Sequence, residues 1–340
     1  FVYRQAVKAK AFDALRGLLP AASLSNVGIY GTGQAYEALL LRMRSHPLPE
    51  SRYYADLMLR ELRKVIPSFL ERVDREDRGV VWSEYLQETR EDTADVVAAL
   101  FPEGSIVDPS PTVRLVDFDP EGEVKMIASM MYPHSTMSED QLERRVAGMN
   151  HEDRMAVARA YVGDRRNRRH KPGRALERPF YRFDVLVDYG AFRDLQRHRM
   201  LSMDWQNLSP HHGYISSPLV NAAGMGPVYE EAMERSAALY DLLVDDFPDQ
   251  ASYAINLAYK IRFNMNINAR SAMHLIELRT TPQGHPSYRE VGQEMHRLIA
   301  EEAGHTVISE MMKFVDHTDE TDLERLQSER RAQEKRQSTK

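Results

Sequence analysis

The chain has 340 residues, of which 42% are hydrophobic and 28% charged, so it is long and apolar enough to bury one large core or two ordinary ones. Its net charge of −6 argues against bulk nucleic-acid binding as the main role, and its lack of cysteine excludes disulfides, thiolate metal sites and cysteine nucleophiles. Because it contains no run of about 18 apolar residues and no visible signal peptide, we expect a cytoplasmic protein without a membrane span.

The first part of the chain, residues 1–74, is predicted to be mainly helical. Apolar residues recur at helical spacing in 35–43 and again in 54–73, and Pro67 is expected to kink or break the second of these segments. Residues 75–105 are charged and irregular, which indicates a connecting segment that carries one helix.

Three glycines precede the first of these helices, at Gly28, Gly31 and Gly33. A glycine-rich turn between a strand and a helix is typical of dinucleotide-binding folds. Here the apolar run before the glycines is very short, and no β-α-β continuation follows. We therefore favour the alternative, in which the glycines occupy backbone positions that need a positive φ or a close approach.

The middle of the chain is predicted to mix strands and helices. Residues 113–118 alternate like a strand, 121–131 and 138–149 have helical patterns, and 182–188 forms a second strand. The segment 154–174 is strongly basic. Such a segment either holds a polyphosphate or forms a solvated face or mobile loop, and we favour the second interpretation.

The last part of the chain is predicted to consist of helices around one apolar segment. Helical patterns cover 227–245 and 269–278, and a long amphipathic helix is expected over 288–314. Residues 254–265 are apolar, without a clear assignment. Residues 316–340 are nearly all polar or charged, which indicates a solvated helix or a frayed tail.

An internal repeat is indicated when residues 12–66 are laid on residues 249–303. In this comparison Ala35 to Arg42 fall on Ala272 to Arg279. The order and approximate spacing of the shared features hold over about 50 residues. We interpret this as a duplicated unit whose first copy is cut short at Phe1.

A dense cluster of donors follows the second strand directly: Arg197, His198 and Arg199. Because an arginine fork matches phosphate oxygens two at a time, this triplet suits a phosphate or pyrophosphate group, although such a triplet also occurs on solvated helix faces. A second polar set follows about 65 residues later at helical spacing: Asn268, Arg270, His274 and Arg279.

Together these motifs resemble the flavin-dependent thymidylate synthases, the ThyX family. The resemblance consists of Arg-His-Arg after a strand, an Asn-x-Arg-Ser helix start, a Leu-Arg pair two turns later, and His285 at the entry to a final helix. It covers residues 106–313 as a full repeat carrying the flavin motif. Residues 1–74 then form the C-terminal part of a first repeat, 75–105 the connection, and 314–340 a charged tail.

The resemblance implies an α/β (α+β) fold, in which long helices surround a mixed or antiparallel sheet. It implies reductive methylation of dUMP to dTMP, with FAD as the cofactor and with methylenetetrahydrofolate and NADPH as co-substrates. The lack of cysteine is consistent with the flavin-dependent class, because the unrelated class of thymidylate synthase needs a cysteine nucleophile. Family members are homotetramers, which a duplicated chain would imitate as a homodimer.

Two alternatives to this activity stay open, and one further function is disfavoured. The chain is expected to act on another pyrimidine nucleotide if its pocket is reshaped, or to be a non-catalytic paralogue if its motifs have decayed. RNA binding through Arg165 to Arg174 is the least expected function, because the net charge is negative. A metal site is not expected either, since His211 and His212 are adjacent and lack a carboxylate at metal spacing.

By position, the resemblance assigns FAD contacts to one set of residues: Arg197, His198, Arg199, Asn268, Arg270 and His274. It assigns the catalytic role to Arg279, which is expected at the uracil, where a fixed cation favours the base deprotonated at N3.

The positions expected to bind the substrate are these: Asp194, Trp205, Asn207, Ser209 and Arg16. Trp205, Asn207 and Ser209 stand where the family pattern has Glu, Ser and Arg, and Asp194 stands where it has Gln. A carboxylate at that last position would repel a phosphate. Arg16 belongs to an Arg-x-x-Leu-Pro segment that only the first copy keeps, so we expect Arg16 to serve a pocket whose flavin contacts come from the second copy.

Overall fold

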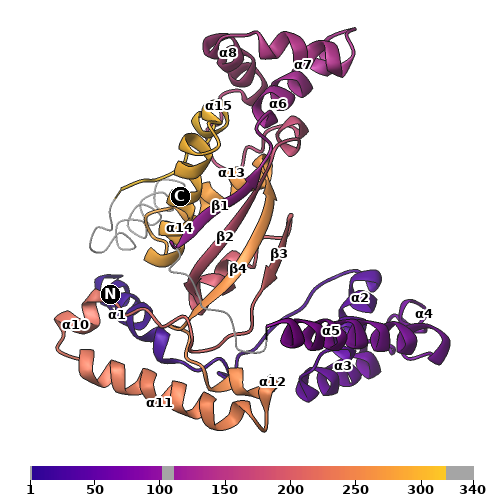
Figure 1. The fold of residues 1–340 in the computed structure, drawn as a ribbon, viewed down its shortest axis with the longest axis vertical. Coiled ribbons are helices and arrows are strands. Elements are labelled where there is room, and N and C mark those ends of the chain that lie inside the picture. Colours follow the sequence, from indigo (N-terminus) through magenta and orange to yellow (C-terminus); the bar gives the residue numbers. More distant parts are fainter. Residues whose placement is uncertain (1, 102–110, 319–340) are drawn as a thin grey trace, which may run out of the picture. The chain divides into compact units, whose positions relative to one another are not determined.

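The computed structural model describes residues 2–101 and 111–318 of the chain. It contains two compact units, which we treat separately (Figure 1). The first unit comprises Phe1–Ala21, Ser110–Tyr240 and Ser252–Lys340, and the second comprises Ala22–Pro109 and Asp241–Ala251. The unit boundaries differ from the expected repeat boundaries, and the duplication itself stays a prediction.

The first unit is organised around an antiparallel sheet with the strand order β1-β2-β4-β3. Its strands are β1 (Val113–Phe118), β2 (Phe180–Asp188), β3 (Leu201–Trp205) and β4 (Lys260–Asn268). The two central strands, β2 and β4, pair along their whole length, from Phe180 opposite Asn268 to Asp188 opposite Lys260. The expected α+β fold with an antiparallel sheet is thereby confirmed.

The core of this unit follows from a period of two along the central strands. On β4, Ile261, Phe263, Met265 and Ile267 are buried and alternate with polar residues, as expected for a strand with one covered face. On β2, Tyr181, Phe183 and Val185 are buried in the same manner. The second half of the apolar segment predicted at 254–265 is therefore the beginning of a central strand.

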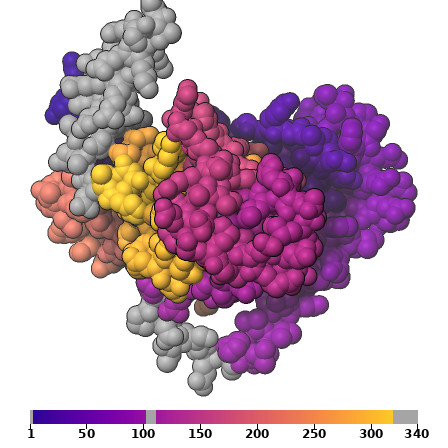
Figure 2. Space-filling model, turned by 90° about the horizontal axis from the view of Figure 1, so that it is seen from above, coloured from indigo at the N-terminus to yellow at the C-terminus, as the bar shows by residue number. Residues whose placement is uncertain are grey.

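Helices pack against the sheet, with α13 and α14 along one face (Figure 1). The helices of this unit are α1 (Val2–Leu15), α6 (Gly122–Met131), α7 (Glu139–Ala147), α8 (His151–Val162), α9 (Tyr189–Leu195), α10 (Pro218–Ala222), α11 (Gly226–Val244, which continues into the second unit), α13 (Ala269–Arg279), α14 (Pro286–Glu301) and α15 (Thr306–Glu310). The space-filling view shows α6 to α8 as one magenta surface with the yellow α15 region beside it (Figure 2). Across that boundary, Nε2 of His151 in α8 lies 3.2 Å from Oε1 of Glu310 in α15.

The prediction of one long helix over 288–314 is wrong. Helix α14 ends at Glu301, and α15 begins only at Thr306. Between them Gly304 has a φ of +69°, in the left-handed region that L side chains rarely adopt. The apolar pattern continues across this break because α15 also buries Val307 and Ile308.

The second unit is helical in the part of the chain that the structure describes. It contains α2 (Gly33–Arg44), α3 (Pro49–Leu62), α4 (Pro67–Leu70), α5 (Val81–Leu100) and α12 (Pro248–Ala251). Its core consists of Leu40, Ala55, Leu59, Leu70 and Val73. The predicted break at Pro67 is confirmed, because Pro67 starts a separate short helix.

The glycines before α2 do not form a dinucleotide-binding turn, since no strand precedes them in the described residues. None of the three has a positive φ. The close-approach explanation holds for Gly33, where a Cβ would lie 2.5 Å from the Phe69 ring. Gly28 has nothing within 4 Å of that position.

Within the first unit, two segments far apart in the chain pair in antiparallel fashion. Leu257 N donates to Leu19 O at 2.8 Å, and Ala21 N donates to Ile255 O at 2.8 Å. Ala258 N donates to Gly17 O at 3.0 Å. We refer to residues 17–21 and 255–258 as the paired segments.

Among the described residues, every helix is too short or too polar to span a membrane.

Candidate functional site

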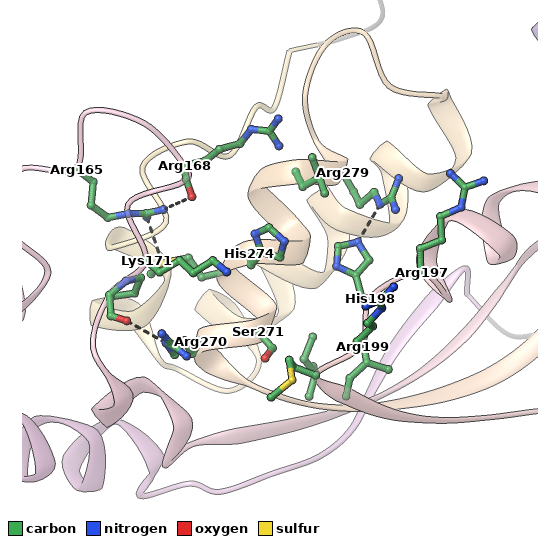
Figure 3. A pocket seen from close by; sticks show the side chains of 16 residues that line it. Arg165, Arg168, Lys171, Arg197, His198, Arg199, Arg270, Ser271, His274 and Arg279 are labelled. Atoms are coloured by element: carbon green, nitrogen blue, oxygen red, sulfur yellow. Dashed lines mark hydrogen bonds between the residues drawn. The ribbon is translucent and has the colours of Figure 1, made fainter. Parts of the chain in front are cut away.

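Five of the six predicted flavin residues surround one pocket of about 440 Å³ in the first unit, which we call the basic pocket (Figure 3). Four parts of the chain line it: the loop after α8, the turn between α9 and β3, the ends of β3 and β4, and helix α13. The lining residues are Arg165, Arg168, Lys171, Pro172, Arg197, His198, Arg199, Met200, Leu201, Ile267, Arg270, Ser271, Met273, His274, Leu278 and Arg279.

The lining of the basic pocket combines cationic and apolar side chains. Seven of its residues are Arg or Lys, and none is acidic. Clustered charge of one sign in a cleft concentrates the field there and favours anions. The apolar part comes from Ile267, Met273 and Leu278, among others. The pocket thus matches a ligand that carries phosphate groups and a flat apolar ring.

The end of β4 sets the position of α13 and of its pocket residues. The Asn268 side chain accepts a hydrogen bond from Ser271 N at 2.9 Å and so caps the helix, which confirms the predicted helix start. Arg270 and His274, four residues apart on α13, therefore share one face. Arg270 also donates through Nε to Pro172 O at 2.9 Å and pairs with Glu177 at 3.0 Å.

At the other end of α13, Arg279 contacts the turn that carries the Arg-His-Arg triplet. Its Nε donates to His198 Nε2 at 3.0 Å, as the dashed line in Figure 3 shows. Burial, and then the positive charge of Arg279 and the neighbouring His274, lower the pKa of His198 to about 4. At neutral pH, His198 is therefore an uncharged acceptor that orients the Arg279 guanidinium.

Asp194, the last residue but one of α9, places a carboxylate behind the basic pocket. Its Oδ1 lies 3.5 Å from Arg279 Nη1 and 3.2 Å from Arg197 Nη1. Its backbone carbonyl also accepts from Arg279 Nη2. Two of the pocket's arginines thus share one counter-charge, which lies outside the lining itself.

The basic segment 154–174 divides into three kinds of residue. Arg166 and Arg169 are exposed, as the solvated-face interpretation predicts. Arg168 and Lys171 line the basic pocket, and the Arg165 side chain is buried against Glu277. Sequence reasoning did not assign Arg168 or Lys171 to the site, and the density of cations was the only available signal.

The structure brings six of the seven predicted flavin and catalytic residues into the basic pocket: Arg197, His198, Arg199, Arg270, His274 and Arg279. Asn268 caps α13 instead of lining the pocket. Their binding roles stay predictions.

The positions predicted to bind substrate are not part of that lining, although Asp194 contacts two of its arginines. Trp205 ends β3, and its ring lies 5.7 Å from that of Phe192. Asn207 is exposed and Ser209 is buried. Arg16 lines a different pocket, of about 490 Å³, together with Asp188 and His285. The expected union of Arg16 with the flavin residues in a single cavity is therefore not seen within the chain.

The described residues contain no group of three or more His, Cys, Asp or Glu side chains placed to hold a metal ion.

Comparisons with known proteins point to the same part of the chain. Residues 114–304 match a family described as thymidylate synthase complementing protein. A UPF0159 protein of Chlamydia pneumoniae is 38% identical over 331 residues, which is 97% of this chain and 61% of that protein. A UPF0159 protein of Thermoplasma acidophilum is 30% identical over 336 residues, 96% of this chain and 64% of that protein. The chain spans about three-fifths of the length of these relatives.

Two solved structures are similar to the chain at low identity. One is the UMP/dUMP methylase PolB of Streptomyces cacaoi bound with 5-Br dUMP, at 18% identity and a TM-score of 0.45, covering 58% of this chain and 94% of that one. The other is the flavin-dependent thymidylate synthase of Helicobacter pylori complexed with FAD and dUMP, at 18% identity and a TM-score of 0.43, covering 59% of this chain and 99% of that one.

Proposed function

The chain belongs to the family of thymidylate synthase complementing proteins, and we propose that it acts as a flavin-dependent thymidylate synthase. It would convert dUMP to dTMP with FAD as the cofactor, methylenetetrahydrofolate as the one-carbon donor and NADPH as the reductant. The observation that carries this proposal is the gathering of six motif residues, from two distant parts of the sequence, around one cationic pocket.

The residues of the basic pocket fit the two chemical halves of FAD. Arg270, Arg199 and Arg197 supply donors for a pyrophosphate, and the pocket lining contains no carboxylate to oppose it. Ile267, Met273 and Leu278 supply an apolar wall for a ring system. When bound in its reduced form, the flavin supplies the hydride for the reductive step.

Arg279 is the residue we propose to act on the pyrimidine. Its side chain is 12% exposed, and its guanidinium is held by His198 and Asp194. A cation fixed in this manner stabilises negative charge that develops on the uracil ring, because it needs no reorganisation when that charge appears. His198 assists by accepting a hydrogen bond from Arg279 Nε–H, which it does only while its own Nε2 is unprotonated.

The proposal is tested by adding FAD to the purified protein and measuring, by equilibrium dialysis and visible absorption, how much flavin stays bound. We then expect release of tritium from dUMP labelled at C5 when methylenetetrahydrofolate and NADPH are supplied. Retained flavin without tritium release would favour an enzyme acting on another nucleotide. Absence of both would favour a non-catalytic paralogue.

A second candidate function is methylation of a different pyrimidine nucleotide, and Asp194 is the observation that favours it. Its carboxylate neutralises part of the charge of Arg197 and Arg279, the two arginines it contacts. A monophosphate placed beside it meets a repulsive charge. Comparing the affinities of dUMP, UMP and dCMP distinguishes the candidates, since tighter binding of UMP or dCMP would favour the second. Equal binding of dUMP and deoxyuridine would show that the phosphate is not recognised.

We expect Asp194→Asn to bind dUMP more tightly than the unaltered protein, by about fivefold or about 1 kcal/mol. The substitution removes the carboxylate that pairs with Arg279 and Arg197, while its amide oxygen still accepts a hydrogen bond. Isothermal titration at low and moderate salt measures the change. Asp204→Asn, on the exposed strand β3, is the matched control and is expected to leave the affinity unchanged. An equal gain in both variants would contradict a local effect of Asp194.

We also propose that residues 12–66 and 249–303 are two copies of one unit. Helices α3 and α14 start at Pro49 and Pro286, which fall on each other when residues 12–66 are laid on 249–303 without a gap, and a small gap brings His46-Pro47 onto His285-Pro286 instead. The paired segments 17–21 and 255–258 are also nearly equivalent positions, and such self-pairing is typical of a two-fold contact. A homodimer of such chains would imitate the family's tetramer, and light scattering of the purified protein measures this.

A further inference from the structure

The loop after α8 is attached to α13 by a buried ion pair. The side chains of Arg165 and Glu277 are 3% and 0% exposed. The pair is bidentate, with Nη1 2.6 Å from Oε1 and Nη2 2.5 Å from Oε2. A planar guanidinium held at two points on a carboxylate has one orientation, so the loop has a defined position on the helix.

The same guanidinium also organises the loop itself. Arg165 Nε donates to His170 O at 2.8 Å, and Nη2 lies 3.5 Å from Arg168 O. At the far end of the loop the donor comes from the helix, because Arg270 of α13 donates to Pro172 O at 2.9 Å. Two arginines therefore fix the loop at both ends, Arg165 from the loop and Arg270 from α13.

What this fixed loop presents to the basic pocket is positive charge. Arg168 and Lys171 line the pocket, and neither has an ion-pair partner within residues 2–101 and 111–318. Lys171 runs across the pocket toward His274 (Figure 3). After burial, the charges of Lys171 and Arg168 are the main causes that lower the pKa of His274. The two cations thus act at the face of α13 that carries Arg270 and His274.

We propose that residues 163–173 form a phosphate clamp, in which Arg168 and Lys171 bind a phosphate group of the pocket's ligand and the Arg165–Glu277 pair positions them. This inference rests on the proposed function, because it takes the ligand to be FAD or a pyrimidine nucleotide. Both offer the same chemistry, a phosphate oxygen, which a lysine binds as a point charge and an arginine binds with its fork.

The clamp is tested with charge-matched variants of one loop. Lys171→Gln and Arg168→Gln each remove a cation from the pocket, and Arg166→Gln and Arg169→Gln each remove an exposed cation outside it. The affinities of FAD, FMN and riboflavin follow from quenching of flavin fluorescence, and that of dUMP follows from calorimetry. We expect the pocket variants to lower the affinity for a phosphorylated ligand about tenfold and to leave the affinity for riboflavin unchanged.

The pattern of losses identifies the phosphate and decides the inference. Loss confined to FAD and FMN places the flavin phosphates in the clamp, and loss confined to dUMP places the nucleotide phosphate there. Equal losses in the Arg166 and Arg169 variants would overturn the clamp, because the effect would then come from the general field of the loop. Unchanged affinity for every ligand in the Lys171 and Arg168 variants would overturn it as well.

The positioning role of the ion pair has a separate readout. In Arg165→Met/Glu277→Leu both charges are removed together, which avoids leaving one buried charge alone. This variant is expected to keep its circular dichroism and to lose about as much affinity as Lys171→Gln. Adding Lys171→Gln to it is expected to cause little further loss, because both changes disable one clamp. Wild-type affinity in the folded double variant would refute the positioning role.

Failure of the clamp is distinguishable from failure of the proposed function. If the unaltered protein binds neither FAD nor dUMP, inorganic pyrophosphate serves as the probe in thermal unfolding. A rise in Tm with pyrophosphate that is lost in Lys171→Gln and kept in Arg166→Gln would support the clamp while the proposed function fails. No rise in the unaltered protein would overturn both.

Discussion

Glu277→Gln is expected to lower the free energy of unfolding by about 3–5 kcal/mol, because it leaves the Arg165 guanidinium buried without a counter-charge. The glutamine has nearly the same shape, so the loss comes from the charge and not from a cavity. Glu277 Oε1 also lies 3.5 Å from Phe314 N, and that contact survives with an amide oxygen. Urea unfolding followed by circular dichroism measures the change.

The matched control is a glutamate of similar chemistry on the surface. Glu301 pairs with Arg297, and their side chains are 63% and 47% exposed. Because exposed pairs contribute little, Glu301→Gln is expected to change the free energy of unfolding by less than about 1 kcal/mol. Arg165→Met/Glu277→Leu is expected to recover much of the loss seen in Glu277→Gln. Similar losses in Glu277→Gln and Glu301→Gln would refute the special cost of the buried charge.

Acidification is expected to destabilise the fold through His198. Its pKa is about 4 in the folded protein, against 6.5 for an unperturbed histidine. Between these two values the unfolded chain binds a proton that the folded protein does not, so stability falls as the pH drops below about 6.5. The loss is complete below about pH 4 and is on the order of 3 kcal/mol.

The measurement is the slope of unfolding free energy against pH between about 4 and 7. His198→Gln removes the titrating group and keeps an acceptor for Arg279, so its slope is expected to be shallower than that of the unaltered protein. Other histidines with lowered pKa, including His274 and His305, keep part of the slope. His134→Gln, at an exposed position, serves as the control. An unchanged slope in His198→Gln would contradict the assignment.

The fold was predictable where one pattern determined the outcome. Residues 113–118 alternate and form β1, and the helical pattern over 138–149 forms α7, with Ser138 as its N-cap. β4 was missed although Ile261, Phe263 and Met265 alternate with polar residues, because the neighbouring apolar residues 254–259 obscured its start. The break at Gly304 was missed because an apolar stripe records which face is buried and does not record the sign of φ.

The site was predictable in its linear motifs and not in its tertiary contacts. Arg197 to Arg199 and the helix start at Asn268 are local patterns, so their residues were identified. Arg165 and Glu277 lie 112 residues apart, and nothing local distinguishes Arg165 from the exposed Arg166. Only the folded chain selects which cation of a basic run is buried, which lines a pocket and which meets solvent.

The paired segments have a consequence for the order in which the molecule is made. Residues 17–21 are synthesised about 240 residues before residues 255–258. At a synthesis rate of about 5–20 residues per second, this separation is a delay on the order of 10–50 s. Their hydrogen bonds therefore form only after three of the four strands, β1, β2 and β3, have been synthesised. During that interval Arg16 has no complete cavity to line, because Leu257 and His285, which line the second pocket with it, are synthesised later.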